Sequence, residues 1–235
     1  MGRIDVHAHL LPGIDDGSRT IEESIEIACR MVAAGYSTLV CTPHVWPNLD
    51  NDAVTIALRV AEMQGILDAR DIPLHLRPGG EMHLSRQFVQ TPVEDYVTYD
   101  LAGRYALFDF WTESLPPYFD LCVKRMIDAG ITPILAHPER ITAIQHKPEI
   151  VENAAETGLL LQCNLECLGE SISTERGRLA TRWLREGRYF MIGSDLHRID
   201  TLERRLIGLD RAAEIVGHSE LDRLTIENPA RLLGV

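Results

Sequence analysis

The chain has 235 residues, 45% hydrophobic and 25% charged, which are ordinary values for a globular domain with a substantial core. Its formal net charge of -12 argues against nucleic acid or an anionic membrane surface as the main partner. It has no N-terminal signal peptide and no apolar run near the ~18 residues of a membrane span, so we expect a cytoplasmic protein without membrane insertion. The five cysteines form no CxxC pair, which favours reduced, buried thiols.

Short apolar runs alternate with helical patterns along the whole chain. Each run is bounded by glycine, proline or charged residues, as is typical of buried parallel strands. Thr20 and Glu23 form a capping box before the first helix. In chain order we expect strand 3–7, helix 20–34, strand 37–42, loop 45–52, helix 52–70, strand 74–79, a mixed excursion 83–103, strand 104–110, helix 117–129, strand 132–136, helix 148–157, strand 159–163, loop 164–173, helix 174–186, strand 189–193, and helices 201–216, 219–225 and 228–233.

This alternation predicts a single domain over residues 1–235 with an α/β fold, a distorted seven-stranded TIM-like barrel of parallel strands. An open doubly wound sheet is the structural alternative. An open sheet gathers its site at one switch point, whereas here ligand-type side chains follow nearly every strand, which favours the barrel.

Histidines and acids stand at or just beyond the ends of the predicted strands. His7 and His9 share one side of the first strand and can grip one ion. Asp195 and His197 repeat this spacing after the last strand, although Asp195 could instead cap the next helix. A cluster of this kind predicts a multinuclear metal site with hydrolytic chemistry. The residues so placed are His7, His9, His44, Glu81, Asp109, His137, Asp195 and His197.

The functional assignment of two loop residues, Asp16 and Arg140, depends on their neighbours. Asp16 lies in GIDDGS after the first strand, where spacing alone does not separate a metal ligand from a turn former. Arg140 follows His137 by three residues, and a guanidinium beside bound cations suggests an anion between them, for which phosphate fits. A surface ion pair with Glu139 is the alternative for Arg140. His83, close to Glu81, is a further candidate to line the mouth of the barrel.

The segments IDVHAHLLPGIDDGS, TPH, GGEMH, YALFDF, ILAHPER, GSDLH and ENPARLL together resemble the polymerase and histidinol phosphatase (PHP) superfamily. Within it, the chain is similar to the bacterial tyrosine-protein phosphatases of capsule and exopolysaccharide loci. The resemblance implies a metal-dependent phosphomonoesterase with three divalent ions, usually manganese, with iron or zinc as alternatives. It also implies a substrate: phosphotyrosine on the tail of a bacterial tyrosine kinase that controls polysaccharide export.

The resemblance further implies a role for each candidate residue, with Arg140 holding the phosphate. The first ion would take His7, His9, Glu81 and Asp195, the second Glu81, Asp109 and His137, and the third Asp16, His44 and His197.

The chain departs from this family pattern at two positions. Asp109 stands where the family usually has glutamate, which affects the metal spacing. Leu202 stands where a second arginine is common, with Arg198 and Arg204 nearby.

Three rival functions follow from the same sequence. A small-molecule phosphatase of this fold, acting on a substrate such as histidinol phosphate, would use the same metal chemistry. An amidohydrolase would need a carboxylated lysine, and neither Lys124 nor Lys147 ends a predicted strand. A non-enzymatic interaction module would show gaps in the ligand set. The sequence leaves the oligomeric state open, including a homo-oligomer.

Overall fold

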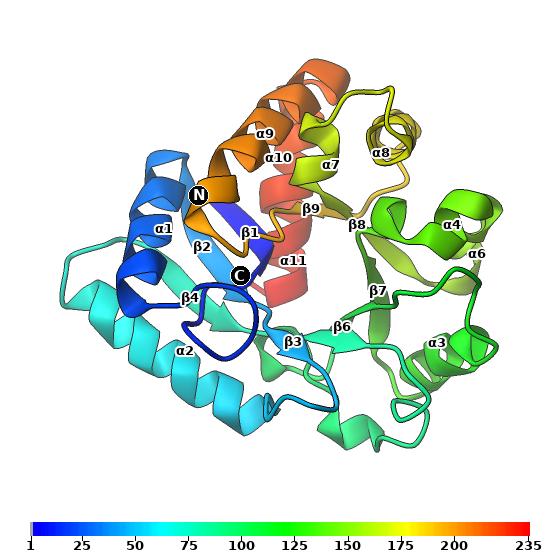
Figure 1. The fold of residues 1–235 in the computed structure, drawn as a ribbon, viewed down its shortest axis with the longest axis horizontal. Coiled ribbons are helices and arrows are strands. Elements are labelled where there is room, and N and C mark those ends of the chain that lie inside the picture. Colours follow the sequence, from blue (N-terminus) through cyan, green and yellow to red (C-terminus); the bar gives the residue numbers. More distant parts are fainter. Residues whose placement is uncertain (1) are drawn as a thin grey trace.

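Parallel strands make up two sheets in the computed structural model, which describes residues 2–235 (Figure 1). In chain order, the strands are β1 (Arg3–Ala8), β2 (Tyr36–Cys41), β3 (His44–Val45), β4 (His75–Pro78), β5 (Glu81–His83), β6 (Tyr105–Asp109), β7 (Thr132–Ala136), β8 (Leu160–Asn164) and β9 (Met191–Gly193). The smaller sheet has the order β1-β2-β4, and the larger has the order β3-β5-β6-β7-β8-β9. Each of the seven predicted strand regions therefore contains strand structure.

Two of the predicted strands bend and contribute to both sheets. β2 continues across residues 42–43 into β3, and β4 continues across residues 79–80 into β5. A Cβ atom on Gly80 would lie 2.8 Å from side-chain atoms of both Val45 and Val97, so this bend requires glycine. The bends carry the chain from one sheet into the other and give the barrel its distortion.

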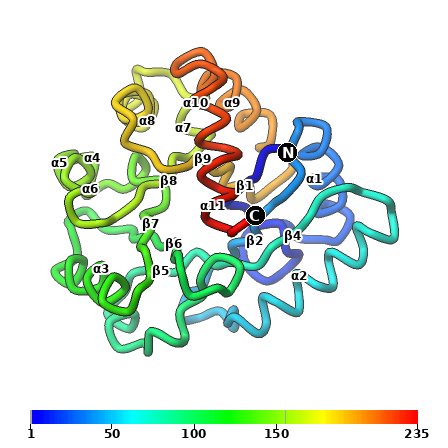
Figure 2. Tube along the Cα trace, turned by 180° about the vertical axis from the view of Figure 1, so that it is seen from behind, coloured from blue at the N-terminus to red at the C-terminus, as the bar shows by residue number. Residues whose placement is uncertain are grey.

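The first and last strands approach each other on the opposite side of the barrel. Ala8 pairs with Leu196 in a single parallel bridge just beyond β9, and the His9 N–H donates to the Leu196 carbonyl at 2.9 Å. This seam closes the curl, so the expected distorted barrel of parallel strands is confirmed (Figures 1 and 2).

Helices surround the sheets and bury the larger part of the core against their outer faces. They are α1 (Ile21–Ala33), α2 (Ala53–Asp68), α3 (Phe119–Asp128), α4 (Thr142–His146), α5 (Glu149–Glu152), α6 (Ala154–Thr157), α7 (Leu165–Gly169), α8 (Glu175–Arg185), α9 (Leu202–Val216), α10 (His218–Asp222) and α11 (Asn228–Leu233). Thr20 caps α1 as expected, its side chain accepting from the Glu23 N–H at 3.2 Å. Among residues 2–235, no helix combines the length and apolar character needed to cross a membrane.

The C-terminal helix α11 closes the barrel at the end where the strands begin (Figure 2). Leu232 and Leu233 pack against Ile4 and Val6 of β1 in a second hydrophobic cluster inside the curl. The Arg104 guanidinium, just before β6, donates to the Leu232 carbonyl at 3.2 Å. The opposite end, where the strands finish, is left for polar side chains.

Several local expectations need adjustment. The predicted helix 148–157 is divided into α5 and α6, and the predicted helix 219–225 into α10 and a π-helical turn at Arg223–Glu227. The helix α4 was not expected. The predicted loop 164–173 begins with α7, because the Asn164 side chain caps it by accepting from the Glu166 N–H at 2.8 Å. The excursion 83–103 contains short 3₁₀ turns at Val93–Asp95 and Tyr99–Leu101.

Candidate metal centre

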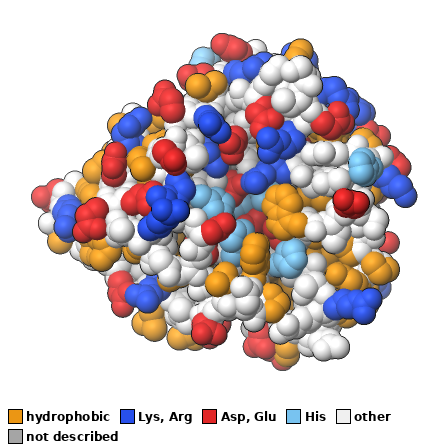
Figure 3. All heavy atoms as spheres, in the orientation of Figure 1, with side chains coloured by type: hydrophobic (Ala, Val, Ile, Leu, Met, Phe, Trp, Pro, Cys, Tyr) orange, Lys and Arg blue, Asp and Glu red, His pale blue; other side chains and the backbone are white. Residues whose placement is uncertain are grey.

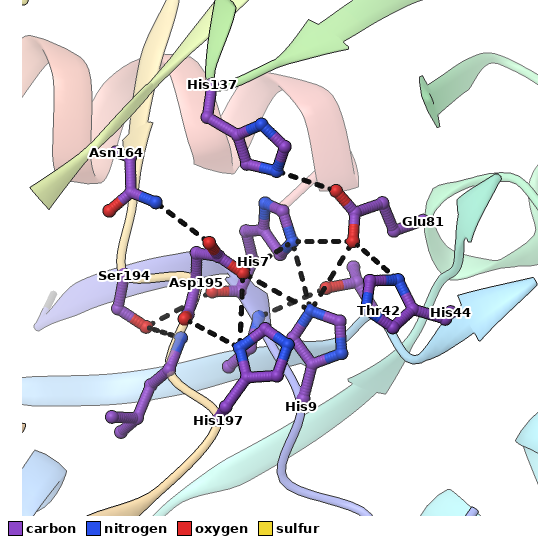
Figure 4. A network of polar contacts seen from close by, with 12 residues as sticks. His7, His9, Thr42, His44, Glu81, His137, Asn164, Ser194, Asp195 and His197 are labelled. Atoms are coloured by element: carbon purple, nitrogen blue, oxygen red, sulfur yellow. Dashed lines mark hydrogen bonds and ion pairs between the residues drawn. The ribbon is translucent and has the colours of Figure 1, made fainter. Parts of the chain in front are cut away.

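Most of the predicted ligand residues converge at the ends of the strands (Figure 4). Asp109, the last residue of β6, lies beside them. His7 lies within β1, and His9 is the first residue after the end of β1. His44 and Glu81 begin the short strands β3 and β5, beyond the two bends. His137 follows β7, while Asp195 and His197 follow β9. The two bends thus place β3 and β5, which continue β2 and β4, at the mouth of the barrel.

Four of these side chains point donor atoms at a common centre. His7 Nε2 and His9 Nε2 are 3.2 Å apart. Glu81 Oε2 lies 3.4 Å from His7 Nε2 and 3.5 Å from His9 Nε2, and Asp195 Oδ1 lies 3.4 Å from both nitrogens. Tetrahedral ligands bonded at about 2.0–2.2 Å are about 3.3–3.6 Å from one another, so these spacings suit one divalent cation.

Neighbouring side chains hold the two imidazoles in the orientation that a ligand needs. His7 Nδ1 lies 2.8 Å from Gln162 Oε1, and His9 Nδ1 lies 2.8 Å from Asp15 Oδ2. If each Nδ1 donates, each Nε2 turns a lone pair toward the centre. Asp15 also accepts from the Gly17 and His44 N–H groups, so it joins three segments of the site.

A second donor group overlaps the first. His7, Glu81, His137 and Asp195 present donor atoms within 4.8 Å of one another, and all four residues are buried. His137 Nε2 lies 2.8 Å from Glu81 Oε1, so the two oxygens of Glu81 face different histidines. A carboxylate in this position can bridge two ions.

Asp109 lies beside these donors and belongs to neither of the two groups that meet the 4.8 Å spacing. Its Oδ1 is 2.9 Å from His83 Nδ1, while its Oδ2 is buried without a hydrogen-bond partner. Burial first, and then the nearby charge of Glu81, raises the pKa of the Asp109 carboxyl. Asp109, which stands where glutamate was expected, therefore has a shorter side chain whose Oδ1 contacts His83.

The outer donor group contains His9, Asp16, His44 and His197. Asp16 Oδ1 lies 3.3 Å from His44 Nε2 and 3.3 Å from His197 Nε2. Hydrogen bonds from His197 and then His44 hold the pKa of Asp16 far below its usual value. The Asp16 side chain is 68% exposed, so this group forms the solvent side of the centre.

Buried polar atoms without partners show that the side chains alone do not complete this arrangement. Such atoms are costly in a protein interior unless something pairs with them. Their location among acids and imidazoles fits divalent metal ions. In the donor cluster they are Asp109 Oδ2 and His137 Nδ1, whereas His44 Nδ1 and Glu81 Oε2, which also lack a well-formed hydrogen bond, lie 3.0 Å from each other.

The charges of the cluster are mutually dependent. Burial raises the pKa values of Glu81 and Asp195, but His7 and the other histidines outweigh this and hold both carboxyl groups ionised, with lowered pKa values. Burial lowers the pKa of His7, yet Glu81 and Asp195 together raise it to about 9. A proton on His7 thus occupies the place that a cation would take.

The backbone around the last ligands is strained and firmly held. His137 has φ +32° and Asp195 has φ +50°, in the left-handed region that non-glycine residues seldom adopt. The buried Arg205 side chain, from α9, donates to the carbonyls of Ser194 and Asp195, each at 2.8 Å. Asp5 accepts from the Ser194 N–H at 2.9 Å, tying this segment to β1.

A cavity of about 310 Å³ opens above the donors. The space-filling view shows histidine and acidic side chains in a hollow in the middle of this face (Figure 3). Arg140 lines the cavity and pairs with Asp195, and its Cζ lies 5.2 Å from the centroid of the Trp111 ring. The lining residues are Asp16, His44, Trp46, Glu81, Trp111, His137, Arg140, Asp195 and His197.

Neither Arg198 nor Arg204, the arginines near Leu202, lines this cavity. Leu202 is buried in the core. Arg198 pairs with Glu23 at 2.8 Å, and Arg204 lies 3.6 Å from Glu166.

The comparisons with known proteins agree with this geometry. Residues 3–234 match the sequence profile of the family described as capsular polysaccharide synthesis, CpsB/CapC. The chain belongs to the CpsB/CapC family. It is 26% identical to the tyrosine-protein phosphatase YwqE of Bacillus subtilis over 98% of this chain and 91% of that protein. It is 23% identical to the tyrosine-protein phosphatase CpsB of Streptococcus pneumoniae over 98% of both chains.

Solved structures extend the CpsB/CapC comparison to three dimensions. A structure from the study of YwqE from Bacillus subtilis and CpsB from Streptococcus pneumoniae, described as unique metal-dependent tyrosine phosphatases, superposes with a TM-score of 0.87. It has 26% identity and covers 98% of this chain and 94% of that one. The phosphotriesterase homology protein of Escherichia coli, with phosphate in its active site, reaches a TM-score of 0.64 at 10% identity over 98% of both chains. That second likeness concerns the fold alone.

Sequence reasoning missed the residues that orient the ligands. Gln162 and Asn164 are polar residues two apart in an apolar strand, a spacing that puts both on one face and was an available signal. Asn164 Nδ2 donates to Asp195 Oδ2 at 2.8 Å. Asp15 and Arg205 gave no comparable signal, because one adjoins another acid and the other lies within a helix.

Proposed function

We propose that the protein is a metal-dependent tyrosine-protein phosphatase that hydrolyses phosphotyrosine monoesters. The observation that carries the proposal is the meeting of the overlapping His, Asp and Glu donor groups with Arg140 in one cavity. The tyrosine-phosphatase activity of YwqE and CpsB, given in their names, supports the substrate class. The family description supports a role in capsular polysaccharide synthesis, with the phosphotyrosine tail of a bacterial tyrosine kinase as the partner.

The proposed centre holds three divalent ions, with manganese as the expected metal. The spacings around His7 and His9 support a first site, the contact between His137 and Glu81 a second, and the contacts of Asp16 a third. The full ligand sets are His7, His9, Glu81 and Asp195; Glu81, Asp109 and His137; and Asp16, His44 and His197.

Bound divalent ions would supply an activated water and offset the charge that develops on the phosphoryl oxygens. Arg140 supplies the protein's own cationic contact: its guanidinium, paired with Asp195 at the cavity wall, can turn to a phosphoryl oxygen and stabilise the transition state. Gln162 and Asp15 keep the His7 and His9 rings from rotating. Arg140 thus faces the reacting phosphoryl group, whereas Gln162 and Asp15 act through the histidine rings that they orient.

The proposal is tested by measuring metal content together with kcat/KM for a phosphotyrosine peptide and for histidinol phosphate. We expect the peptide to be the better substrate, because the donor groups are visible from outside in an open hollow (Figure 3). The opposite ranking would assign the protein to the small-molecule phosphatases. Full activity in a verified metal-free sample would refute metal dependence.

A further inference from the structure

Two tryptophans stand at the mouth of the cavity, each against a histidine of the donor cluster. Trp46 directly follows β3, and its ring centroid lies 4.4 Å from that of His44. Trp111 lies two residues beyond β6, with its ring centroid 5.4 Å from that of His137. In the sheet, β3 and β6 lie on either side of β5, which carries Glu81. The two indoles therefore come from strands that flank the central carboxylate.

The rest of the cavity lining is polar or charged. Apart from the two tryptophans, it consists of histidines, carboxylates and Arg140. The phosphoryl group of a substrate must approach those polar residues, so the organic part of the ester has the indoles as its apolar neighbours. Trp111 is 44% exposed, and an aromatic ring placed against it would remove apolar surface from water.

We propose that Trp46 and Trp111 are specificity residues that contact the phenyl ring of phosphotyrosine. The proposal rests on the phosphatase function proposed above and assigns substrate selection to these two side chains. Aromatic pairs contribute beyond simple area burial and favour offset or edge-to-face packing. An alkyl ester such as phosphoserine would leave the indole surfaces uncovered.

Trp111 also contacts Arg140, whose Cζ lies 5.2 Å from its ring centroid. This cation–π contact could position the guanidinium for any phosphate ester. The two roles have different consequences, because a lost aromatic contact weakens binding of the phosphotyrosine peptide, whereas a displaced Arg140 also weakens binding of inorganic phosphate.

The test compares wild type with Trp46→Leu, Trp111→Leu, the double variant and the two conservative Trp→Phe variants, all with their metal loaded. KM and kcat are measured for a phosphotyrosine peptide, and Ki for inorganic phosphate as a competitive inhibitor. Leu58→Ala is the control for loss of an apolar side chain, because Leu58 is 61% exposed on α2 and outside the cavity lining. Metal content and melting temperature show whether each variant is folded and loaded.

We expect each Leu variant to raise KM for the peptide by about fivefold to tenfold, with Ki for phosphate within about twofold of wild type, and the Phe variants to recover most of the loss. Unchanged peptide KM in the loaded double variant would overturn the proposal. Equal weakening of peptide and phosphate would also overturn it and leave Trp111 as a positioning residue for Arg140. Failure of the wild-type enzyme on every phosphotyrosine peptide would instead refute the phosphatase function itself.

Discussion

Binding of divalent metal should release protons from the donor histidines. Burial lowers the pKa of His7, but Glu81 and Asp195 raise it to about 9. Burial likewise opposes the charged form of His44, and contacts with Asp16 and Glu81 raise its pKa to about 11. Both rings are therefore protonated at pH 7 in the metal-free protein. A histidine must be neutral to bind a metal ion, so loading removes one proton from each ring.

The size of the effect follows from the His7 pKa of about 9. At pH 7, removing that proton costs about 2.7 kcal/mol, since one pKa unit corresponds to about 1.4 kcal/mol. This cost weakens the apparent metal affinity at the first site about a hundredfold. We expect the affinity to recover as pH rises from 7 to about 9, where the His7 ring titrates.

Titration calorimetry in buffers of different ionisation enthalpy measures the protons released at pH 7. Direct titrations between pH 6 and 9 give the affinity. His7→Gln should release fewer protons, whereas His75→Gln, which changes an exposed histidine at the start of β4, should behave as wild type. A binding enthalpy independent of buffer, together with an affinity that does not change with pH, would refute this reasoning.

Four further predictions follow from the same structure. Chelation should abolish activity and Mn²⁺ restore it, whereas thiol alkylation should leave activity largely intact, because four cysteines are buried and the exposed Cys29 lies on α1. Arg140→Ala should lower kcat about a hundredfold with little change in metal content or melting temperature; wild-type kinetics would remove Arg140 from the site. Asp109→Ala should lose one ion and nearly all activity while Asp109→Glu keeps measurable activity; a full metal complement with normal turnover in the alanine variant would leave Asp109 as a partner of His83 alone. In the metal-free protein, the stabilisation from His7 should be fully present below pH 6.5 and lost as pH rises through about 9, because folding raises the pKa of His7. Denaturant unfolding measures the difference in unfolding free energy between wild type and His7→Gln. A difference that is the same at pH 6 and pH 9 would contradict this prediction.

The strand ends were predictable because two local signals coincide there. An apolar run followed by a histidine or acid, as at His137 and Asp195, marks both the strand and its functional end. The bends at residues 42–43 and 79–80 were not predicted, because they depend on close packing of Gly80 against Val97, which is distant in sequence. Local pattern therefore located the strands without showing how two of them pass between sheets.

The residues that orient the ligands were harder to predict for a physical reason. Which of two adjacent acids, Asp15 or Asp16, turns inward depends on the loop conformation. Arg205 reaches the carbonyls of Ser194 and Asp195 because α9 packs against α7 and α8, and no short-range pattern specifies that packing. Donor residues are recognised by type and position, whereas their supports depend on the assembled fold.

The seam between β1 and β9 has a consequence for biosynthesis. His7 and His9 leave the ribosome early, but the first donor group lacks Asp195 until more than four-fifths of the chain has been made. The single bridge between Ala8 and Leu196 and the contact from Asp5 to Ser194 join the same two ends. Contacts of such long sequence separation form late in folding. A nascent chain therefore exposes its N-terminal histidines before Asp195, the last of their acidic partners, exists, and full metal loading is a post-translational event.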